Sequence, residues 1–313
     1  MLANKTVIVI CGPTASGKTA LGVALARALD GEVVGADSMQ IYRDMDIGTA
    51  KPTVEEMGDV PHHMIDVADP WEDFSVARYV DMALPIVEDI LSRGKRPIIV
   101  GGTGLYIDNL LAGRQFAAFS GKIRKKLERC RQQEGLGVLY AELGRVDPQR
   151  QKELHPNDEK RILRALEIFY ETGQTMSAFN AESQTQPPRF QAARIALNYA
   201  DRKDLWARID QRVDKMMELG LADEVRRLLI SGVPPTATSM QAIGYKELAA
   251  AVQGKDDLDE AVRVIKLRSR QYAKRQLSWF RRHEDTHWIT WEKNPDFSTA
   301  LQSSTAFLKE LGI

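Results

Sequence analysis

The segment that most constrains the fold is a short apolar run followed at once by a glycine-rich loop. Residues 7–11 read VIVIC, a β-branched run typical of a strand that is buried on both faces of a parallel sheet. Residues 12–19 read GPTASGKT, which matches G-x-x-x-x-G-K-[ST], and the Ala- and Leu-rich stretch over about 18–29 predicts a helix. Strand, loop and helix in this order predict a phosphate-binding loop, here called the P-loop, at residues 12–19.

The P-loop carries the groups that a bound phosphate needs. Its glycines let backbone N–H groups turn inward, Lys18 supplies a positive charge, and the hydroxyl of Thr19 is placed to bind Mg²⁺. The motif alone does not name a reaction, because many kinases and nucleotide hydrolases share it. The residues predicted to bind a diphosphate or a nucleotide such as ATP are Gly12, Pro13, Thr14, Ala15, Ser16, Gly17, Lys18 and Thr19.

The residues at the ends of two later strands restrict the reactions that the site could catalyse. A strand expected at about 32–36 ends at Asp37, whose carboxylate could bind Mg²⁺, act as a general base, or only cap the following segment. The strand that ends at Val100 is followed by GGTG, where an ATP-hydrolysing protein usually has a carboxylate for Mg²⁺. This disfavours ATP hydrolysis and leaves the hydroxyl of Thr103 facing the same pocket. The glycines could equally serve only the geometry of a turn.

Alternating strand and helix patterns in the first part of the chain predict an α/β fold with a P-loop NTPase-like parallel sheet. A third short strand is expected near residues 64–66 and a helix over 75–93. We predict that residues 1–114 and 191–313 form this catalytic core, with a helical C-terminal part.

The character of the sequence changes over residues 115–190, where strand signals stop. Amphipathic, charged helices are expected at about 121–134 and 157–172, and a loop at 182–190. We therefore predict a helical insertion domain here, followed by a strand at 191–199 that returns to the sheet. The later elements are expected as helices at about 202–218, 221–230, 240–252 and 258–281, a strand near 286–290 and a final helix.

Charge and composition indicate the partner and the cellular compartment of the protein. Lys+Arg and Asp+Glu both number 43, yet residues 1–100 have a net charge of −6 and residues 101–313 one of +6. This asymmetry indicates that residues 101–313 bind an anionic partner. The two cysteines, Cys11 and Cys130, form no disulfide framework or zinc spacing, and no apolar run approaches a membrane span. We expect a cytoplasmic protein with no membrane partner.

Two basic clusters are candidates for contact with nucleic-acid phosphates. Residues 263–282 contain eight Lys or Arg and no acid, with Tyr272, Trp279 and Phe280 interleaved, and Lys266, Arg270 and Lys274 share one helical face. The alternative is an amphipathic helix with a solvated basic face. The second cluster is on the insertion and also includes Glu128, which offers local pairing; its basic residues are Lys122, Arg124, Lys125, Lys126, Arg129 and Arg131.

Several long motifs resemble those of the tRNA dimethylallyltransferases. They are GPTASGKT (12–19), ADSMQIYRDMDIGTAKP (36–52), VGGTGLY (100–106), HPNDEKRILRALE (155–167), AIGYKEL (242–248) and RQYAKRQLSWFR (270–281). They occur in the family's order over about 270 residues. Because no Cys/His zinc-finger extension is present, the chain resembles the bacterial branch.

The resemblance implies a reaction. A dimethylallyl group moves from dimethylallyl diphosphate to the exocyclic N6 amine of the adenosine 3′ of the anticodon, and the P-loop holds the diphosphate with Mg²⁺. Lys18, a Thr19-bound Mg²⁺ and Arg212 then stabilise the leaving diphosphate. Asp37 accepts a hydrogen bond or proton from the amine, and Thr103 helps to hold the base.

The resemblance also implies where tRNA binds. The partners are the tRNA anticodon stem-loop and dimethylallyl diphosphate. The sequence does not give the oligomeric state, and we expect a monomer. A base in an RNA loop must leave its stack to be alkylated, which calls for a basic and aromatic surface around the pocket. The positions carried over as tRNA-binding are Asp37, Ser38, Met39, Gln40, Thr103, Arg124, Lys160, Arg161, Ile162, Leu163, Arg164, Gln241, Ala242, Ile243, Gly244, Tyr245, Lys246, Lys274, Arg275, Gln276, Leu277, Ser278, Trp279, Phe280 and Arg281.

Two rival hypotheses explain part of the sequence. A P-loop kinase of a small metabolite accounts for residues 12–19 and Asp37, but not for the basic segment at 263–282 or the large insertion. An RNA-binding protein with a vestigial nucleotide site accounts for the basic surface, but not for an intact Gly-Lys-Thr beside Asp37.

Overall fold

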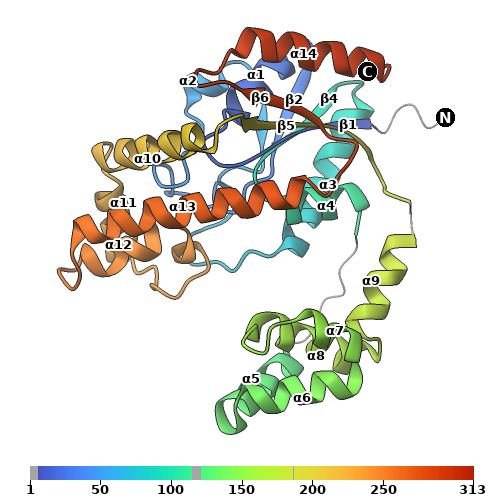
Figure 1. The fold of residues 1–313 in the computed structure, drawn as a ribbon, viewed down its shortest axis with the longest axis vertical. Helices are drawn as coiled ribbons and strands as arrows, with labels where there is room; N and C mark the ends of the chain where they lie inside the picture. Colours follow the sequence, from blue (N-terminus) through green and yellow to red (C-terminus); the bar gives the residue numbers. More distant parts are fainter. Residues whose placement is uncertain (1–5, 115–120, 186) are drawn as a thin grey trace. The chain divides into compact units, whose positions relative to one another are not determined.

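A computed structural model of the chain describes residues 6–114, 121–185 and 187–313. The chain divides into two compact units, one made of residues 1–115 and 189–313 and the other of residues 116–188. Figure 1 shows strands and helices in the first unit and helices in the second.

The sheet of the first unit is parallel, with the strand order β3-β2-β4-β1-β5-β6. The strands are β1 (Thr6–Cys11), β2 (Gly31–Gly35), β3 (His62–His63), β4 (Arg96–Val100), β5 (Gln191–Tyr199) and β6 (His287–Trp291). β1 pairs with β4 and β5, and the side chains from Val7 to Ile10 are fully buried. The apolar run at residues 7–11 thus forms a central strand, and the predicted α/β fold is confirmed.

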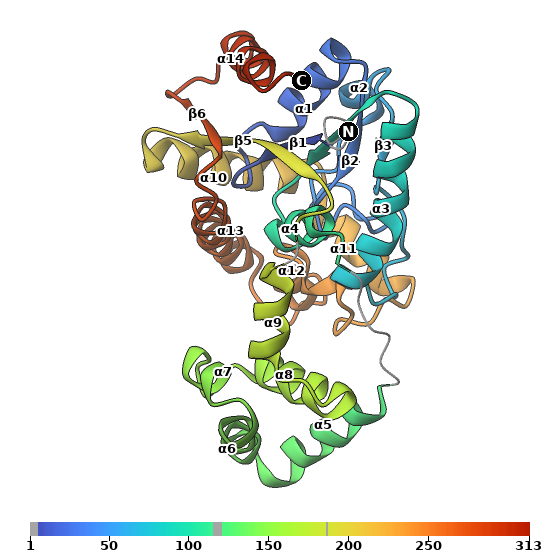
Figure 2. The same ribbon diagram turned by 90° about the vertical axis from the view of Figure 1, so that its right-hand side faces the viewer.

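Helices cover both faces of this sheet (Figure 2). On one face, α1 (Lys18–Ala28) packs against α14 (Phe297–Glu310). The other face carries α3 (Val76–Ser92), α4 (Gly104–Ala112), α10 (Arg202–Glu218) and α13 (Leu258–Phe280). Because parallel strands end at one edge of a sheet, this arrangement brings together the segments that follow β1, β2 and β4.

Three shorter helices complete the first unit. α2 (Val54–Met57) begins with a capping box in which Thr53 and Glu56 bond each other's backbone N–H groups. α11 (Leu221–Ile230) follows α10 and packs on α12 (Tyr245–Ala251), which in turn packs on α13. The core beneath α1, α10, α13 and α14 is mostly aliphatic and includes Ile8, Ile10, Leu21 and Ile195.

The second unit is a small helical domain with its own core. Its helices are α5 (Lys122–Glu134), α6 (Leu136–Val146), α7 (Pro148–Glu153), α8 (Glu159–Thr172) and α9 (Met176–Thr185). The core includes Leu127, Leu143, Ile162 and Leu166. The buried carboxylate of Asp147 accepts hydrogen bonds from the backbone N–H and hydroxyl of Ser177, at 2.9 and 2.7 Å, and so ties α9 to the start of α7.

Three local expectations need correction. The loop expected at 182–190 is helical up to Thr185. The strand expected near 64–66 lies at 62–63, because Met64 and Asp66 have φ values of 63° and 55° and leave the extended region. The helix expected over 240–252 is split into a 3₁₀ turn at Ser239–Gln241 and α12, because Gly244 (φ 103°) interrupts it.

None of the helices in the described part of the chain is long and apolar enough to cross a membrane.

Candidate functional site

The P-loop makes a tight turn that only glycine can support at two positions. Gly12 and Gly17 have φ values of 138° and 89°, which side chains rarely adopt. A Cβ at Gly12 would lie 2.5 Å from the carbonyl oxygen of Leu197, and one at Gly17 would lie 2.8 Å from the ring of Phe297. The indole Nε1 of Trp291 also donates to the carbonyl of Ser16 at 2.8 Å. The loop is therefore fixed from β5 and from the C-terminal segment.

Two cations meet at the P-loop. The ammonium of Lys18 donates to the carbonyl of Pro13 at 2.7 Å, and Arg212 on α10 lies close enough to interact electrostatically with Lys18 and Asp37. Burial, together with the charge of Arg212, lowers the pKa of Lys18 to about 8. Burial also lowers the pKa of Arg212. Neither cation forms a direct ion pair with a residue in the described ranges, so this site favours an added anion.

Asp37 presents one bonded and one open carboxylate oxygen. Its Oδ1 accepts the backbone N–H groups of Met39 at 2.9 Å and Gln40 at 3.4 Å, which fixes the turn after β2. Oδ2 receives no hydrogen bond from the residues that the structure describes. The capping and functional roles therefore do not exclude each other, because they use different oxygens.

Thr103 lies beside this turn. Its backbone N–H donates to the carbonyl of Ala36 at 3.1 Å, and its hydroxyl oxygen accepts the N–H of Ser38 at 3.1 Å. The structure thus brings together the four predicted catalytic residues Lys18, Asp37, Thr103 and Arg212 at the carboxyl ends of β1, β2 and β4.

The site suits a metal ion that arrives with a phosphate ligand. No cluster of three or more His, Cys, Asp or Glu side chains in the described ranges could hold a metal by itself. Mg²⁺ keeps most of its positions for water and phosphate oxygens and needs few protein ligands. The hydroxyl of Thr19 has no hydrogen-bond partner among the described residues, so it fits the predicted role of a single protein ligand.

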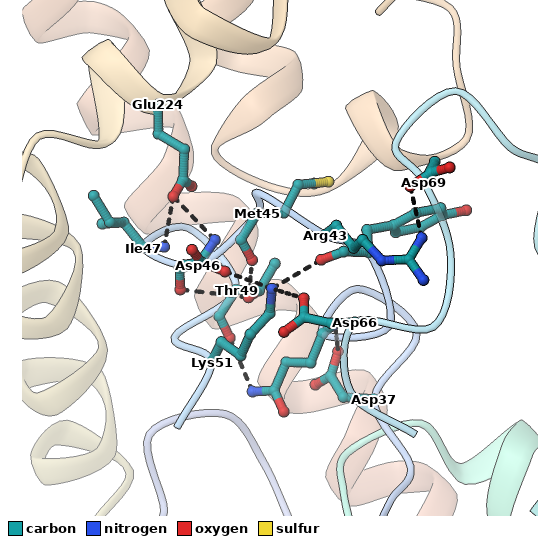
Figure 3. A network of polar contacts seen from close by, with 12 residues as sticks. Asp37, Arg43, Met45, Asp46, Ile47, Thr49, Lys51, Asp66, Asp69 and Glu224 are labelled. Atoms are coloured by element: carbon teal, nitrogen blue, oxygen red, sulfur yellow. Dashed lines mark hydrogen bonds and ion pairs between the residues drawn. The ribbon is translucent and has the colours of Figure 1, made fainter. Parts of the chain in front are cut away.

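A buried carboxylate holds the segment that follows Asp37 (Figure 3). Glu224 on α11 is 2% exposed and accepts the backbone N–H groups of Asp46, Ile47 and Gly48 at 2.9, 2.8 and 3.2 Å. It also accepts the hydroxyl of Tyr245 at 2.5 Å. A Cβ at Gly48 would lie 2.4 Å from the ring of Tyr245, so glycine is required for this close approach.

A second set of contacts joins the same segment to the turn at Asp37. The buried ammonium of Lys51 lies 2.5 Å from the carboxylates of Asp46 and Asp66. The side-chain amide of Gln40 donates to the carbonyls of Thr49 and Ala50 at 3.1 and 3.0 Å. Both amide hydrogens of the Gln40 side chain are thereby bonded inside the protein. Its side-chain oxygen could still accept a hydrogen bond from RNA.

The basic residues of α13 and its C-terminal end fall into two sets. The first set is paired with acids: Arg263 with Glu260, Lys266 with Asp214, Arg268 with Glu247 and Arg270 with Asp210. The second set, Lys274, Arg275, Arg281 and Arg282, has no acidic partner among the described residues. The predicted basic face is therefore neutralised in its first half and open in its second. A surface groove is lined by Gln271, Lys274, Arg275, Ser278, Trp279 and Arg282.

The predicted tRNA-binding positions divide by exposure. In the second unit, Arg124, Arg161 and Arg164 pair with acids of their own helices or caps, and Lys160 is exposed. Ser38, Met39, Thr103, Ile243, Leu277 and Trp279 are partly buried, and Gln241, Lys246, Lys274, Arg275, Ser278 and Arg281 are exposed. The remaining positions are buried: Ile162, Leu163, Ala242, Gly244, Tyr245, Gln276 and Phe280. RNA could reach them only through their neighbours.

Three residues that the structure places near this site had no predicted role in it, although Tyr272 was noted as an aromatic of the basic segment at 263–282. Glu224 and Lys51 hold the segment after Asp37, as described above. Tyr272 lies close enough to Asp37 and Thr103 that burial and the Asp37 charge raise its pKa to about 12. Lys51 is part of the GTAKP string, but Glu224 lies among other helical charges and no local pattern marks it.

The chain matches known proteins over nearly its full length. The family model described as IPP transferase matches residues 40–283, and one described as isopentenyl transferase matches residues 5–68. A tRNA dimethylallyltransferase of Halothermothrix orenii is 46% identical over 91% of this chain and 88% of its own length. The tRNA dimethylallyltransferase 1 of Pelobacter propionicus is 45% identical over 97% of both chains.

Solved structures give the same result. The tRNA isopentenylpyrophosphate transferase of Bacillus halodurans has a TM-score of 0.74 and is 40% identical, over 98% of this chain and 96% of that chain. A eukaryotic dimethylallyltransferase acting on tRNA has a TM-score of 0.84 and is 31% identical, over 98% of this chain and 80% of that chain.

Proposed function

The chain belongs to the IPP transferase family, and we propose that it transfers a dimethylallyl group from dimethylallyl diphosphate to N6 of the adenosine 3′ of a tRNA anticodon. The observation that best supports this reaction is the open Oδ2 of Asp37 beside the two partly buried cations Lys18 and Arg212. An acceptor for an amine hydrogen and a site for a leaving anion are both needed for this reaction, and here they are neighbours.

The first part of the chemistry is departure of the diphosphate. The allylic C–O bond breaks, and its electron pair leaves with the diphosphate, whose charge grows. Lys18 and Arg212 are partly buried and stabilise that charge, so their effect on the transition state is larger than that of fully exposed cations. The hydroxyl of Thr19 would hold a bound Mg²⁺, which would supply further positive charge for the diphosphate oxygens.

The second part is attack by the adenine amine. This nitrogen is a poor nucleophile, because its lone pair is delocalised into the ring. It forms the new N–C bond while one of its hydrogens passes to Oδ2 of Asp37 as a proton. The bonds from Met39 and Gln40 to Oδ1 keep the carboxylate oriented for this role, and Thr103 holds the base next to it.

The RNA partner is a tRNA anticodon stem-loop that contacts the open cations at the end of α13 and the exposed cations of the second unit. This assignment rests on the names of the relatives and on Lys274, Arg275, Arg281 and Arg282, which have no acidic partner within residues 6–114, 121–185 and 187–313. The monomeric state and the cytoplasmic location remain predictions.

The test is an incubation of the protein with unmodified tRNA and either labelled dimethylallyl diphosphate or labelled ATP. Prenyl label in the RNA supports the proposal. ATP turnover stimulated by a small metabolite would instead support the kinase, and tight RNA binding with neither product would support a non-catalytic RNA-binding protein. The relatives and the solved structures favour the transferase over the kinase.

A further inference from the structure

The GGTG loop after β4 is shaped by the helix that packs on it. A Cβ at Gly102 would lie 2.1 Å from Nε2 of Gln276, and one at Gly104 would lie 2.2 Å from the ring of Trp279. Neither glycine has a positive φ, so turn geometry does not require them. These two glycines therefore serve the close approach of α13 to the loop.

The face of α13 that meets this loop is a regular stripe. Tyr272, Gln276 and Trp279, followed by His283 just beyond the helix, are spaced by four, three and four residues, which places helical positions on one side. Trp279 Nε1 donates to the carboxylate of Asp108 on α4 at 2.8 Å, and His283 Nε2 lies 3.1 Å from the same carboxylate. The open cations Lys274 and Arg275 lie at other angles around the helix and are exposed.

Gln276 connects two loops of the site through one amide group. It is 5% exposed; its Nε2 donates to the carbonyl of Gly102 at 3.0 Å, and its Oε1 accepts the backbone N–H of Thr14 at 2.8 Å. Thr14 belongs to the P-loop, and Gly102 directly precedes Thr103. Both polar atoms of this buried side chain are therefore bonded within the protein.

We propose that Gln276 is a positioning residue for prenyl transfer, which holds the P-loop at a fixed distance from the Thr103 loop. The diphosphate and the acceptor base bind to these two loops under the proposed function, on which this inference rests. A fixed spacing between them is needed because a displacement of about 1 Å between reacting groups can cost on the order of 100-fold in rate. The residue acts through Thr14 and Gly102, without touching either substrate.

The first experiment replaces Gln276 by Met, which keeps the length of the side chain but removes both hydrogen bonds. The matched control is Gln302→Met, the same change at an exposed position of α14. Binding of inorganic diphosphate with Mg²⁺ is measured by calorimetry, tRNA binding by filter retention, and prenyl transfer by label incorporation. We expect diphosphate binding of Gln276→Met to weaken by about tenfold and kcat to fall by at least as much, with tRNA affinity unchanged. The control should match wild type.

The second variant, Gln276→Glu, keeps the shape of the side chain and tests the donor alone. An ionised carboxylate can still accept from Thr14 but repels the carbonyl of Gly102, whereas a protonated one can donate to it. We expect its diphosphate affinity, relative to wild type, to recover as the pH is lowered and the introduced carboxyl group is protonated. This variant also decides the matter if Gln276→Met does not fold.

Two results would overturn the inference. One is wild-type diphosphate binding and kcat in both variants; the other is a loss of tRNA affinity with diphosphate binding unchanged, which would make Gln276 an RNA contact. A failure of the proposed function is separate, because it would appear as absence of prenyl transfer by the wild-type protein.

Discussion

The first unit uses positive charge in two different ways. Lys18 and Arg212 are few, partly buried and close to one carboxylate, and burial lowers both of their pKa values. Lys274 and Arg275 are exposed on α13, next to further cations at its C-terminal end. Interactions at the first site are strong and little screened, whereas those at the second are weakened by salt. We infer that the buried pair controls the rate and the exposed set controls RNA affinity.

The same contrast exists along α13 itself. Its first four cations are matched by acids from α10, α12 and its own first turn, whereas the four cations from Lys274 to just past its C-terminal end have no acidic partner in the part of the chain that the structure describes. A charge that is already paired has little to gain from a phosphate. Counting basic residues in a sequence therefore overstates the RNA-binding surface, because the acids that neutralise them come from other elements.

The largest expected effect is at Asp37, the carboxylate that interacts electrostatically with Lys18 and Arg212. Asp37→Asn keeps the size and one oxygen but removes the acceptor for the amine proton. We expect kcat to fall by roughly 10²–10⁴-fold with diphosphate affinity and Mg²⁺ dependence retained. Titration of Mg²⁺ against activity and diphosphate binding checks this. If high Mg²⁺ restored kcat, Asp37 would be a metal ligand instead of the base.

Lys18→Ala separates the two regions directly. It removes a buried charge from the leaving diphosphate and leaves the surface of α13 intact, so we expect prenyl transfer to fall by roughly 10²–10³-fold. The affinity for tRNA should stay within about a few-fold of wild type, because surface charges supply most of it. A collapse of tRNA binding in a folded variant would mean that the buried and exposed charges do not act separately.

Glu224→Ala tests a buried charge that backbone N–H groups compensate. It leaves the N–H groups of Asp46, Ile47 and Gly48 without an acceptor, so we expect a loss of about 3 kcal/mol in the free energy of unfolding. Urea unfolding measures it. The control is Glu218→Ala, whose exposed ion pair with Lys215 should contribute well under about 1 kcal/mol. Equal stability of the two variants would contradict this account of the Asp37 segment.

The pH dependence of diphosphate binding tests the state of Lys18. Its pKa in the free protein is about 8, below the ordinary value of 10.5, so it is protonated at pH 7 and becomes neutral as the pH rises through 8. Because diphosphate itself gains and loses protons in this range, its affinity for the wild type is divided by its affinity for Lys18→Arg at each pH. This ratio should be constant below that pH and fall above it, by at most about tenfold per pH unit. Lys18→Arg should bind without this fall, since arginine keeps its charge. The measurement is calorimetry of diphosphate binding to both proteins between pH 6.5 and about 9.5.

Local sequence patterns predicted most of the fold. The β-branched run, the P-loop and the alternation of elements predicted the sheet, and the bounds predicted for α10 and α11 agree with the structure. Two of the three errors in the predicted elements occurred where one residue's conformation overrides a pattern. Gly244 breaks an otherwise helical stretch, and the positive φ of Met64 ends a strand early.

The site was predictable only in part, for a different reason. Asp37, Thr103 and the P-loop stand at strand ends, where parallel topology brings them together. Arg212 came from the family resemblance alone. Glu224 accepts hydrogen bonds from Asp46–Gly48, and Gln276 is bonded to Gly102 and Thr14. These partners are separated by 170 residues or more of sequence, so no spacing within one element indicates them. Their roles follow from tertiary contacts.

The smallest expected effect compares the two halves of α13. Changing Lys274 and Arg275 together to Ala should reduce the slope of log affinity for tRNA against log salt by about 0.7–0.9 for each lost phosphate contact. The matched control changes Lys266 and Arg270 together to Ala, which removes the same two charges from the paired half of the helix. Its salt slope should equal that of wild type, because those side chains contact Asp214 and Asp210. Diphosphate binding should be unchanged in the first variant, since its side chains face outward. Equal reductions in both variants would show that RNA senses only the total charge of α13, and the division into paired and open halves would have no functional meaning.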